Sequence, residues 1–228
     1  MTDSFQNEGE NKIKASASTR NRLLEAAEKL FSEHGFNGTA VRDIAADAEC
    51  NAASVNYHFG SKEGLYRELW RGYLTQMRIS RVSSVEKIMA EYNGKPKLEE
   101  LLRVFANAFF EPLTNEIKAR GLMVLMMREM LDPHLEKSAF FEEMIKPVMI
   151  VLQDALTTVC PYLSPLQAQL CIFSLIGQLA HIVHIKYVFL LNNEPAVNKV
   201  ELSRAVEHIV RFSAAGIKAY DGYTEGAS

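Results

Sequence analysis

The sequence predicts an all-α protein with a small N-terminal bundle followed by a larger helical domain. Apolar residues recur at helical spacing along most of the chain, and no segment of useful length alternates as a β-strand does. Gly, Asn and Pro residues fall at the breaks between the periodic stretches. With 48% hydrophobic residues among 228, the chain is able to bury a sizeable core.

The first helix is expected to follow a polar N-terminus. Residues 1–17 carry almost no apolar side chains, so we expect a mobile tail there. A helix from about Thr19 to His34 then places one apolar face inward. Gly35 ends it well, because glycine takes the left-handed conformation without a steric penalty. The inward residues of this helix are Leu23, Ala27, Leu30 and Phe31.

Two short helices come next, over residues 41–48 and 52–59. The link between them is short, and its last residue, Asn51, is a good N-cap for the second helix. Gly60 is expected to end that helix and Ser61 to cap the next one. Two short helices joined by a tight turn form the order of a helix-turn-helix. The inner faces are expected to be formed by Val41, Ile44, Ala45, Ala48, Val55 and Phe59.

The remaining chain predicts a series of longer helices. The stretch 166–191 is the most apolar, but Gln, His and Lys side chains interrupt it, so we interpret it as a buried helix of a soluble protein without a membrane span. We divide the chain into a tail at residues 1–17, a helix-turn-helix domain at 18–66 and a helical domain at 67–221. The expected longer helices cover residues 61–92, 98–113, 117–130, 139–159, 165–191 and 199–220, with breaks at 93–96 and 192–195.

Composition restricts the function classes. A formal net charge of -3 excludes a polycation that coats nucleic acid, so DNA binding must come from a local face. The three cysteines have no ligand or framework spacing, which argues against a disulfide scaffold or a zinc site and fits a reducing cytoplasm. The polar N-terminus shows no signal peptide. We find no Gly-rich phosphate loop and no nucleophile elbow, so we expect neither an enzyme nor a cofactor.

The outward face of the helix at 52–59 suits the major groove of DNA, where base edges present distinct hydrogen-bonding patterns. Small residues allow close approach and contact with a thymine methyl group, while Asn56 is able to pair with adenine or hold a phosphate. A lysine in the first turn of the next helix opposes the helix dipole, and a phosphate would resolve that tension. Phosphate contacts fix register and are expected at Thr39, Arg42 and Lys62, and groove contacts at Ala52, Ala53, Ser54, Asn56, Tyr57 and His58.

The segments LLEAAEKLFSEHGFNGTAVRDIA and SVNYHFGSKEGLY resemble the tetracycline-repressor (TetR) family of bacterial regulators over residues 19–70. The resemblance implies a three-helix DNA-binding domain and a variable helical domain that binds a small effector and forms a dimer. The family often has two aromatic residues before the His-Phe pair, whereas this chain has Asn56 as the first of them. The resemblance implies DNA contacts at Thr39, Ala52, Ala53, Tyr57, His58 and Lys62.

A candidate effector site is suggested by methionines that cluster next to an arginine in the helix at 117–130. Methionine repacks around varied shapes, so this cluster is either an adaptable pocket or core filler. The aromatic residues Trp70, Phe105, Phe109 and Phe110 share this ambiguity. A histidine pair, His181 and His184, lies on the apolar helix, but no further ligands support a metal site there. The candidate effector residues are Trp70, Phe105, Phe109, Met123, Met126, Met127, Arg128 and His181.

Together with these patterns, the resemblance to the TetR family implies a homodimeric transcriptional regulator, most simply a repressor that a small-molecule effector releases from a near-palindromic operator. The helices at 166–191 and 199–220 are candidates for the dimer seam, and no membrane is involved. Two copies of the reading helix would enter successive major grooves about 34–36 Å apart. The helix beginning at Ser61 would couple the two domains. The alternative is a helical adaptor that binds protein and not DNA.

Overall fold

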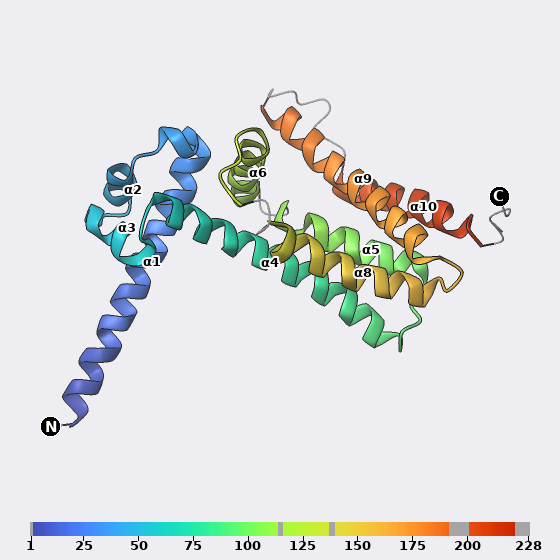
Figure 1. Cartoon of the computed structure of the whole chain (residues 1–228), viewed down its shortest axis with the longest axis horizontal. Helices are drawn as coiled ribbons and strands as arrows, with labels where there is room; N and C mark the ends of the chain where they lie inside the picture. Colours follow the sequence, from blue (N-terminus) through green and yellow to red (C-terminus); the bar gives the residue numbers. More distant parts are fainter. Residues whose placement is uncertain (1, 114–115, 137–139, 192–200, 222–228) are drawn as a thin grey trace. The chain divides into compact units, whose positions relative to one another are not determined.

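The computed structural model describes residues 2–113, 116–136, 140–191 and 201–221, and within these ranges every regular element is a helix (Figure 1). This confirms the predicted all-α fold. The predicted break at residues 192–195 and the expected helix start at 199 lie outside the described residues. The elements are α1 (Thr2–Gly38), α2 (Val41–Asp47), α3 (Ala52–Phe59), α4 (Lys62–Glu91), α5 (Leu98–Phe110), η1 (Glu111–Leu113), α6 (Glu116–Leu131), the π-helical η2 (Phe141–Ile145), α8 (Lys146–Val159), α9 (Pro165–Leu191) and α10 (Leu202–Lys218).

The chain divides into two compact units. The N-terminal unit comprises Met1–Tyr73 and Gly121–Glu136, and the C-terminal unit comprises Leu74–Arg120 and Lys137–Ser228. The first unit therefore extends past the boundary that the sequence suggested at residue 66. Aromatic packing explains the extension, because Tyr66 meets Phe31 edge-on at 5.0 Å and continues along α4 to Trp70 at 6.3 Å.

Helix α1 starts earlier than the sequence predicted. The helix begins at Thr2, whereas we expected a tail without regular structure up to residue 17. Residues 2–17 contain no proline and several Glu, Gln, Lys and Ala residues, whose helix propensity is high. The expected break at the other end is confirmed, since Gly35 has φ 75° and interrupts the helical geometry. Phe36 then packs on Phe31 with ring centroids 5.8 Å apart.

The core of the N-terminal unit is formed by the inward faces predicted for α1, α2 and α3. Complete burial of a Leu, Ile, Val or Phe side chain stabilises the fold by about 1.5–3 kcal/mol each. This apolar core fixes the three short elements on each other and leaves their opposite faces in solvent. The side chains that are fully buried here are Leu23, Ala27, Phe31, Ile44, Val55 and Leu65.

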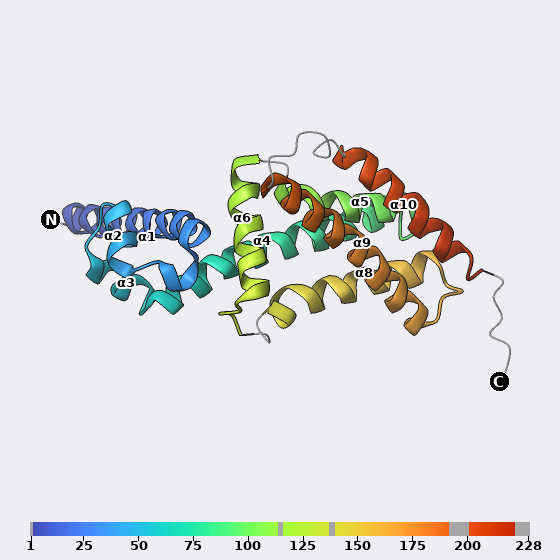
Figure 2. The same ribbon diagram turned by 90° about the horizontal axis from the view of Figure 1, so that it is seen from above.

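The C-terminal unit is built on α10, which packs against α5 and α9, while α9 also packs against α8 (Figure 2). A reciprocal capping box starts α9: the Ser164 N–H donates to the Gln167 side chain at 2.9 Å, and the Gln167 N–H donates to the Ser164 hydroxyl at 3.3 Å. The buried side chains that join these helices include Leu101, Phe105, Leu152, Leu156, Leu175, Leu179 and Val210.

Helix α9 is less buried than its sequence suggested. The part Pro165–Ile185 is long and apolar enough to cross a membrane by length and composition alone, and only 22% of its most apolar window is buried in this chain. Burial of the helix within a single chain is therefore only partial, and the second buried side that the predicted dimer seam would provide stays a prediction. One face packs on α8 and α10, while Leu166, Leu170 and Phe173 are exposed.

Candidate nucleic-acid interface

Helices α2 and α3 are held rigidly by local and tertiary contacts. The Asn51 side chain accepts a hydrogen bond from the Ala53 N–H at 2.9 Å, and Gly60 ends α3 with φ 77°. Both features confirm the predicted caps. An ion pair of 2.6 Å between Lys29 and Asp47 links α1 to α2. These contacts let α3 present one face to solvent without losing its position.

The exposed face of α3 carries the residues that the sequence assigned to the major groove. Ala52, Ala53 and Asn56 are exposed, and Tyr57 is 82% exposed, while Ser54 and His58 are half-buried. The rings of Tyr57 and His58 meet edge-on at 5.0 Å. Val55 is fully buried on the opposite face. The structure therefore brings the expected base-contacting residues together on one surface.

Arg42 lies at the start of α2 and is the most exposed of the residues expected to contact phosphate. Its side chain is 86% exposed, and its guanidinium lies 3.6 Å from the carboxylate of Asp43. Exposed ion pairs of this kind are weak, so they leave the guanidinium available to another anion. The phosphate contact of Arg42 stays a prediction.

Thr39 was expected to contact a phosphate, which stays a prediction, but in this structure its side chain has internal partners. Its side chain is buried, with 3% exposed, and its hydroxyl donates to the carbonyl oxygens of Gly35 at 2.8 Å and Leu30 at 3.1 Å. Carbonyls at the end of a helix lack partners within the helix, so a nearby hydroxyl stabilises them. The structure thus assigns Thr39 to the closure of α1.

Lys62 was also expected to contact a phosphate, which stays a prediction, but its ammonium likewise has internal partners. Its ammonium donates to the carbonyl oxygens of Phe36 at 2.8 Å and Thr39 at 2.9 Å, and it lies 4.3 Å from the centroid of the Phe36 ring. The unfavourable position of a cation in the first turn of α4 is therefore compensated inside the protein. A bound phosphate is not needed to explain this lysine.

The joint between α3 and α4 is tightly packed. A Cβ atom at Gly64 would lie 2.0 Å from the carbonyl oxygen of Phe59, so only glycine fits. The Ser61 hydroxyl accepts from the Gly64 N–H at 3.1 Å, which confirms Ser61 as the predicted cap. The guanidinium of Arg20 lies 5.3 Å from the Phe59 ring and pairs with Glu68 at 2.5 Å.

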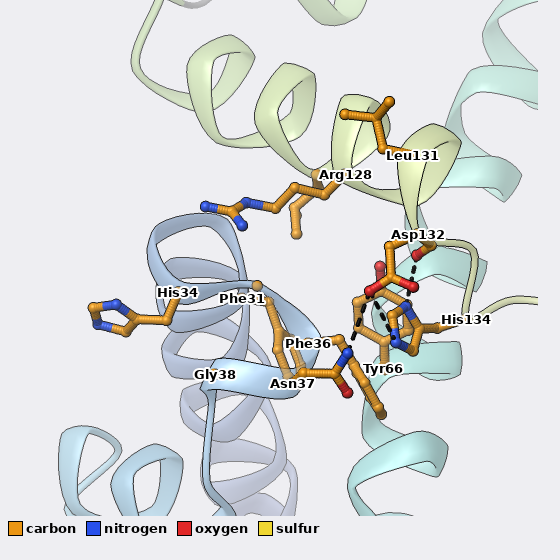
Figure 3. A pocket seen from close by; sticks show the side chains of 12 residues that line it. Phe31, His34, Phe36, Asn37, Gly38, Tyr66, Arg128, Leu131, Asp132 and His134 are labelled. Atoms are coloured by element: carbon orange, nitrogen blue, oxygen red, sulfur yellow. Dashed lines mark hydrogen bonds and ion pairs between the residues drawn. The ribbon is translucent and has the colours of Figure 1, made fainter.

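A cleft of about 290 Å³ lies in the N-terminal unit where the last turn of α6 meets the end of α1 (Figure 3). Arg128 extends from α6 across the end of α1 and donates to the Glu33 carbonyl at 3.1 Å. Glycine at position 35 leaves space for the guanidinium of Arg128, since a Cβ atom added there would lie 2.9 Å from it. Arg128, which the sequence suggested for the effector site, therefore caps a helix in this structure.

The segment after α6 is fixed on the same surface. The hydroxyl of Tyr66 donates to Glu129 at 2.8 Å, and the Asn37 side chain donates to Asp132 at 3.2 Å. The His134 ring packs on Phe36 with centroids 4.3 Å apart. Burial raises the pKa of Tyr66, so its hydroxyl stays a donor at neutral pH. Sequence reasoning missed these contacts, because they join residues far apart in the chain.

The other candidate effector residues divide between the two units. Trp70 and Met123 are buried, and Met126 and Met127 half-buried, in the N-terminal unit. The C-terminal unit holds buried Phe105, half-buried Phe109 and exposed His181, whose ring lies 6.5 Å from that of His184.

Sequence reasoning also missed Arg81, which is only 7% exposed in the C-terminal unit. Its position four residues after Met77, on the inward face of α4, was a signal that could have found it.

Two family models match the chain. The one described as "Bacterial regulatory proteins, tetR family" covers residues 23–69, and the one described as "HTH-type transcriptional dual regulator CecR, C-terminal domain" covers residues 98–217, which is more than half of the chain. The chain belongs to the tetR family of bacterial regulatory proteins. The match over the N-terminal segment contains α2, α3 and the start of α4, so this TetR signature includes the exposed face described above.

Curated relatives match mainly the N-terminal segment. The chain is 42% identical over 60 residues to the probable regulator YttP of Bacillus subtilis, and 47% identical over 57 residues to the repressor KstR2 of Mycobacterium tuberculosis. Each match covers 25% of this chain, and it spans only 29% and 28% of those relatives. A longer match, 29% identical over 133 residues, covers 57% of this chain and 59% of the dual regulator CecR of Shigella flexneri.

Solved structures share the fold over most of the chain. A putative TetR-family regulator from Mesorhizobium loti is 18% identical with a TM-score of 0.65, over 90% of this chain and 96% of that one. The regulator FadR of Bacillus subtilis, solved with stearoyl-CoA, is 18% identical with a TM-score of 0.63, over 86% of this chain and 97% of FadR. At these identities the likeness shows the TetR fold alone.

Proposed function

We propose that this protein is a DNA-binding transcriptional regulator, most simply a repressor that a small-molecule effector releases from its operator. The observation that carries the proposal is the exposed face of α3. Tyr57 stands 82% exposed on a helix whose opposite residue Val55 is fully buried and whose ends are capped. A large aromatic side chain held rigidly in water is suited to a partner surface.

The contacts proposed at this face divide into two kinds. Ala52 and Ala53 allow α3 to approach the floor of the major groove, where Asn56 is able to pair with adenine. Arg42 provides a phosphate contact, which contributes affinity without sequence information. Because the chain has a net charge of -3, binding depends on this local face and not on the overall charge.

We propose a homodimer formed through α9 and α10. Leu166, Leu170 and Phe173 are spaced four and three residues apart, so they lie along one face of α9, and Phe212 adds an exposed ring on α10. Exposed apolar residues in such a row are typical of a subunit interface. The dimer would set two copies of α3 about 34–36 Å apart, to match a near-palindromic operator.

The effector is proposed to bind in the C-terminal unit, around the aromatic pair Phe105 and Phe109. FadR of Bacillus subtilis, which has the same fold, was solved with stearoyl-CoA, so this fold accommodates a ligand of that size. An effector shifts the protein between two states only by its differential affinity for them. A regulator of this kind carries out no catalytic step. It acts in the cytoplasm, where the DNA is.

The test begins with selection of bound genomic fragments by the purified protein, which should return a palindromic site. Tyr57→Ala should then lose about 10- to 100-fold in affinity for this site, equivalent to about 1–3 kcal/mol. Dimer mass and melting temperature should not change. Tyr92→Ala, which removes a 43% exposed tyrosine in the C-terminal unit, is the matched control. Unchanged operator affinity of Tyr57→Ala contradicts the proposal.

Salt dependence distinguishes the regulator from the alternative of a helical adaptor without DNA binding. For a regulator, the logarithm of affinity falls linearly with the logarithm of salt concentration. Arg42→Ala should reduce that slope by about 0.9 for each copy of the chain. A protein that shows no retention on duplex DNA at any salt concentration is an adaptor.

A further inference from the structure

Arg81 is an arginine of α4 whose side chain is buried in the C-terminal unit, with 7% exposed. Its guanidinium carbon lies 4.0 Å from the centroid of the Phe109 ring. Its two terminal nitrogens lie 3.7 Å from the sulfur of Met144 and 3.9 Å from the sulfur of Met77. A thioether sulfur is a weak acceptor, so these contacts satisfy the guanidinium poorly.

In the part of the chain that the structure describes, no carboxylate compensates this charge. Among the residues that the structure describes, none forms an ion pair with Arg81, and its Nε atom has no hydrogen-bond partner. Burial alone lowers its pKa, to about 10, so the group still carries its charge at neutral pH. By contrast, the more exposed Arg103 pairs with Glu207 at 2.9 Å. Within the described ranges, the buried Arg81 therefore has no counter-ion, whereas the surface arginine Arg103 has one.

A buried charge without a partner destabilises the fold, as is seen when one member of a buried ion pair is removed and the other stays buried. The guanidinium of Arg81 therefore resembles the positive member of a buried ion pair whose negative member is missing from the described residues. Its planar array of N–H groups fits a carboxylate or a similar oxyanion at two points. A ligand anion would supply the partner that the described residues do not provide.

The surroundings of Arg81 are suited to an apolar ligand body. Phe109 and, beyond it, Phe105 provide aromatic surface from α5, with ring centroids 6.3 Å apart. Met144 belongs to the π-helical turn η2 (Phe141–Ile145), and π-helical turns are frequent at functional sites. Methionine side chains adapt to varied shapes, so Met77 and Met144 are able to move aside for a ligand.

We propose that Arg81 binds the anionic group of the effector, and that the effector is an apolar organic acid. The oxyanion would replace the two sulfurs as the partner of the guanidinium, while the apolar body would pack on Phe109 and Phe105. The term effector rests on the proposed function above. The binding of an apolar acid at Arg81 does not depend on it.

The experiment uses two fluorescent probes that differ by one charged group, 8-anilinonaphthalene-1-sulfonate and the neutral N-phenyl-1-naphthylamine. The full chain should bind the sulfonate at least 10-fold more tightly, and decanoate should displace it where decanol does not. Arg81→Met should weaken sulfonate binding at least 10-fold and leave the neutral probe unchanged or tighter. Lys87→Met, which removes an exposed charge from the same helix, should behave as the unchanged protein does.

Thermal melting separates this role from a structural one. Because Arg81→Met removes an unpaired buried charge, its melting temperature should be equal to or higher than that of the unchanged protein. Equal loss of both probes with a lower melting temperature would overturn the proposal, and so would unchanged sulfonate binding. If the protein is not retained on DNA but still binds the sulfonate more tightly than the neutral probe, only the proposed function as a regulator is contradicted, and the proposal for Arg81 stands.

Discussion

The ammonium of Lys62 donates to the main-chain carbonyl of Phe36 at 2.8 Å and lies 4.3 Å from the centroid of the ring of the same residue. One side chain at the start of α4 therefore contacts both the backbone and the side chain of Phe36, in the last residues of α1 after its break at Gly35. A cation–π contact and a charge-assisted hydrogen bond act on the same residue. The lysine of the GSKE segment thus connects two helices of the DNA-binding head.

Lys62→Met is expected to lower the free energy of unfolding by about 1–3 kcal/mol, because two carbonyls lose a charged donor. The slope of operator affinity against salt should not change, since the ammonium is directed inward. Chemical denaturation and salt titration measure the two quantities. Unchanged stability together with a slope reduced by about 0.9 would instead assign Lys62 to a phosphate.

Gly64→Ala should destabilise the N-terminal unit strongly, by roughly 2–4 kcal/mol, because the new methyl group collides with the Phe59 carbonyl. Gly72→Ala is the matched control on the same helix, where a Cβ atom meets nothing within 4 Å. That substitution should stabilise the protein by about 0.5–1 kcal/mol, because alanine is the better helix former. Equal melting temperatures for the two variants would show that the joint is not tightly packed.

Stability should depend on pH through Glu99 and Lys218, which are 2.5 Å apart between α5 and α10. The hydrogen bond from Lys218 holds the pKa of Glu99 below its usual value. A lowered folded-state pKa stabilises the fold above the unfolded value near 4.5, and this contribution is lost as pH falls through the folded value. The pair is partly exposed, so it contributes only about 0.2–1 kcal/mol.

Lys218→Met should therefore be less stable than the unchanged chain at pH 7 and equally stable well below the folded-state pKa of Glu99. Denaturant titrations across pH 2–7 measure the difference between the two proteins. A difference that stays constant over this range would mean that the ion pair contributes nothing.

Phe173→Glu should dissociate the proposed dimer, because it places a charge in the middle of the exposed row on α9. The helix should remain folded, since the Phe173 side chain is exposed in the single chain. Phe141→Glu, at a comparably exposed phenylalanine outside α9 and α10, is the control. Sedimentation analysis distinguishes the outcomes, and a dimeric Phe173→Glu would place the interface elsewhere.

The sequence was most informative where structure is decided locally. The bounds 52–59 for α3 and the caps Asn51 and Ser61 are confirmed, because an apolar face, a capping side chain and a glycine act within a few residues. The break at Gly35 follows from the same kind of signal. Such features need no knowledge of the rest of the fold.

The hydrogen-bond partners of polar side chains could not be predicted from local sequence signals. Thr39 and Lys62 were expected to meet phosphate, but carbonyls that converge only after folding accept their hydrogen bonds. The inclusion of Gly121–Glu136 in the N-terminal unit is likewise a long-range property. The helical spacing of buried residues along α4 could have predicted that Arg81 is buried. That no described residue pairs with its charge became clear only from the three-dimensional structure.

The contact of Arg128 with α1 has a consequence for evolutionary drift. Its guanidinium binds the carbonyl oxygen of Glu33, which every amino acid possesses, and it fills the space that glycine leaves at position 35. Position 33 is therefore free to exchange its side chain without weakening the contact, whereas position 35 favours glycine because its φ of 75° lies in the left-handed region. Within this fold, the surface at the end of α1 is able to diversify while its attachment to α6 stays the same.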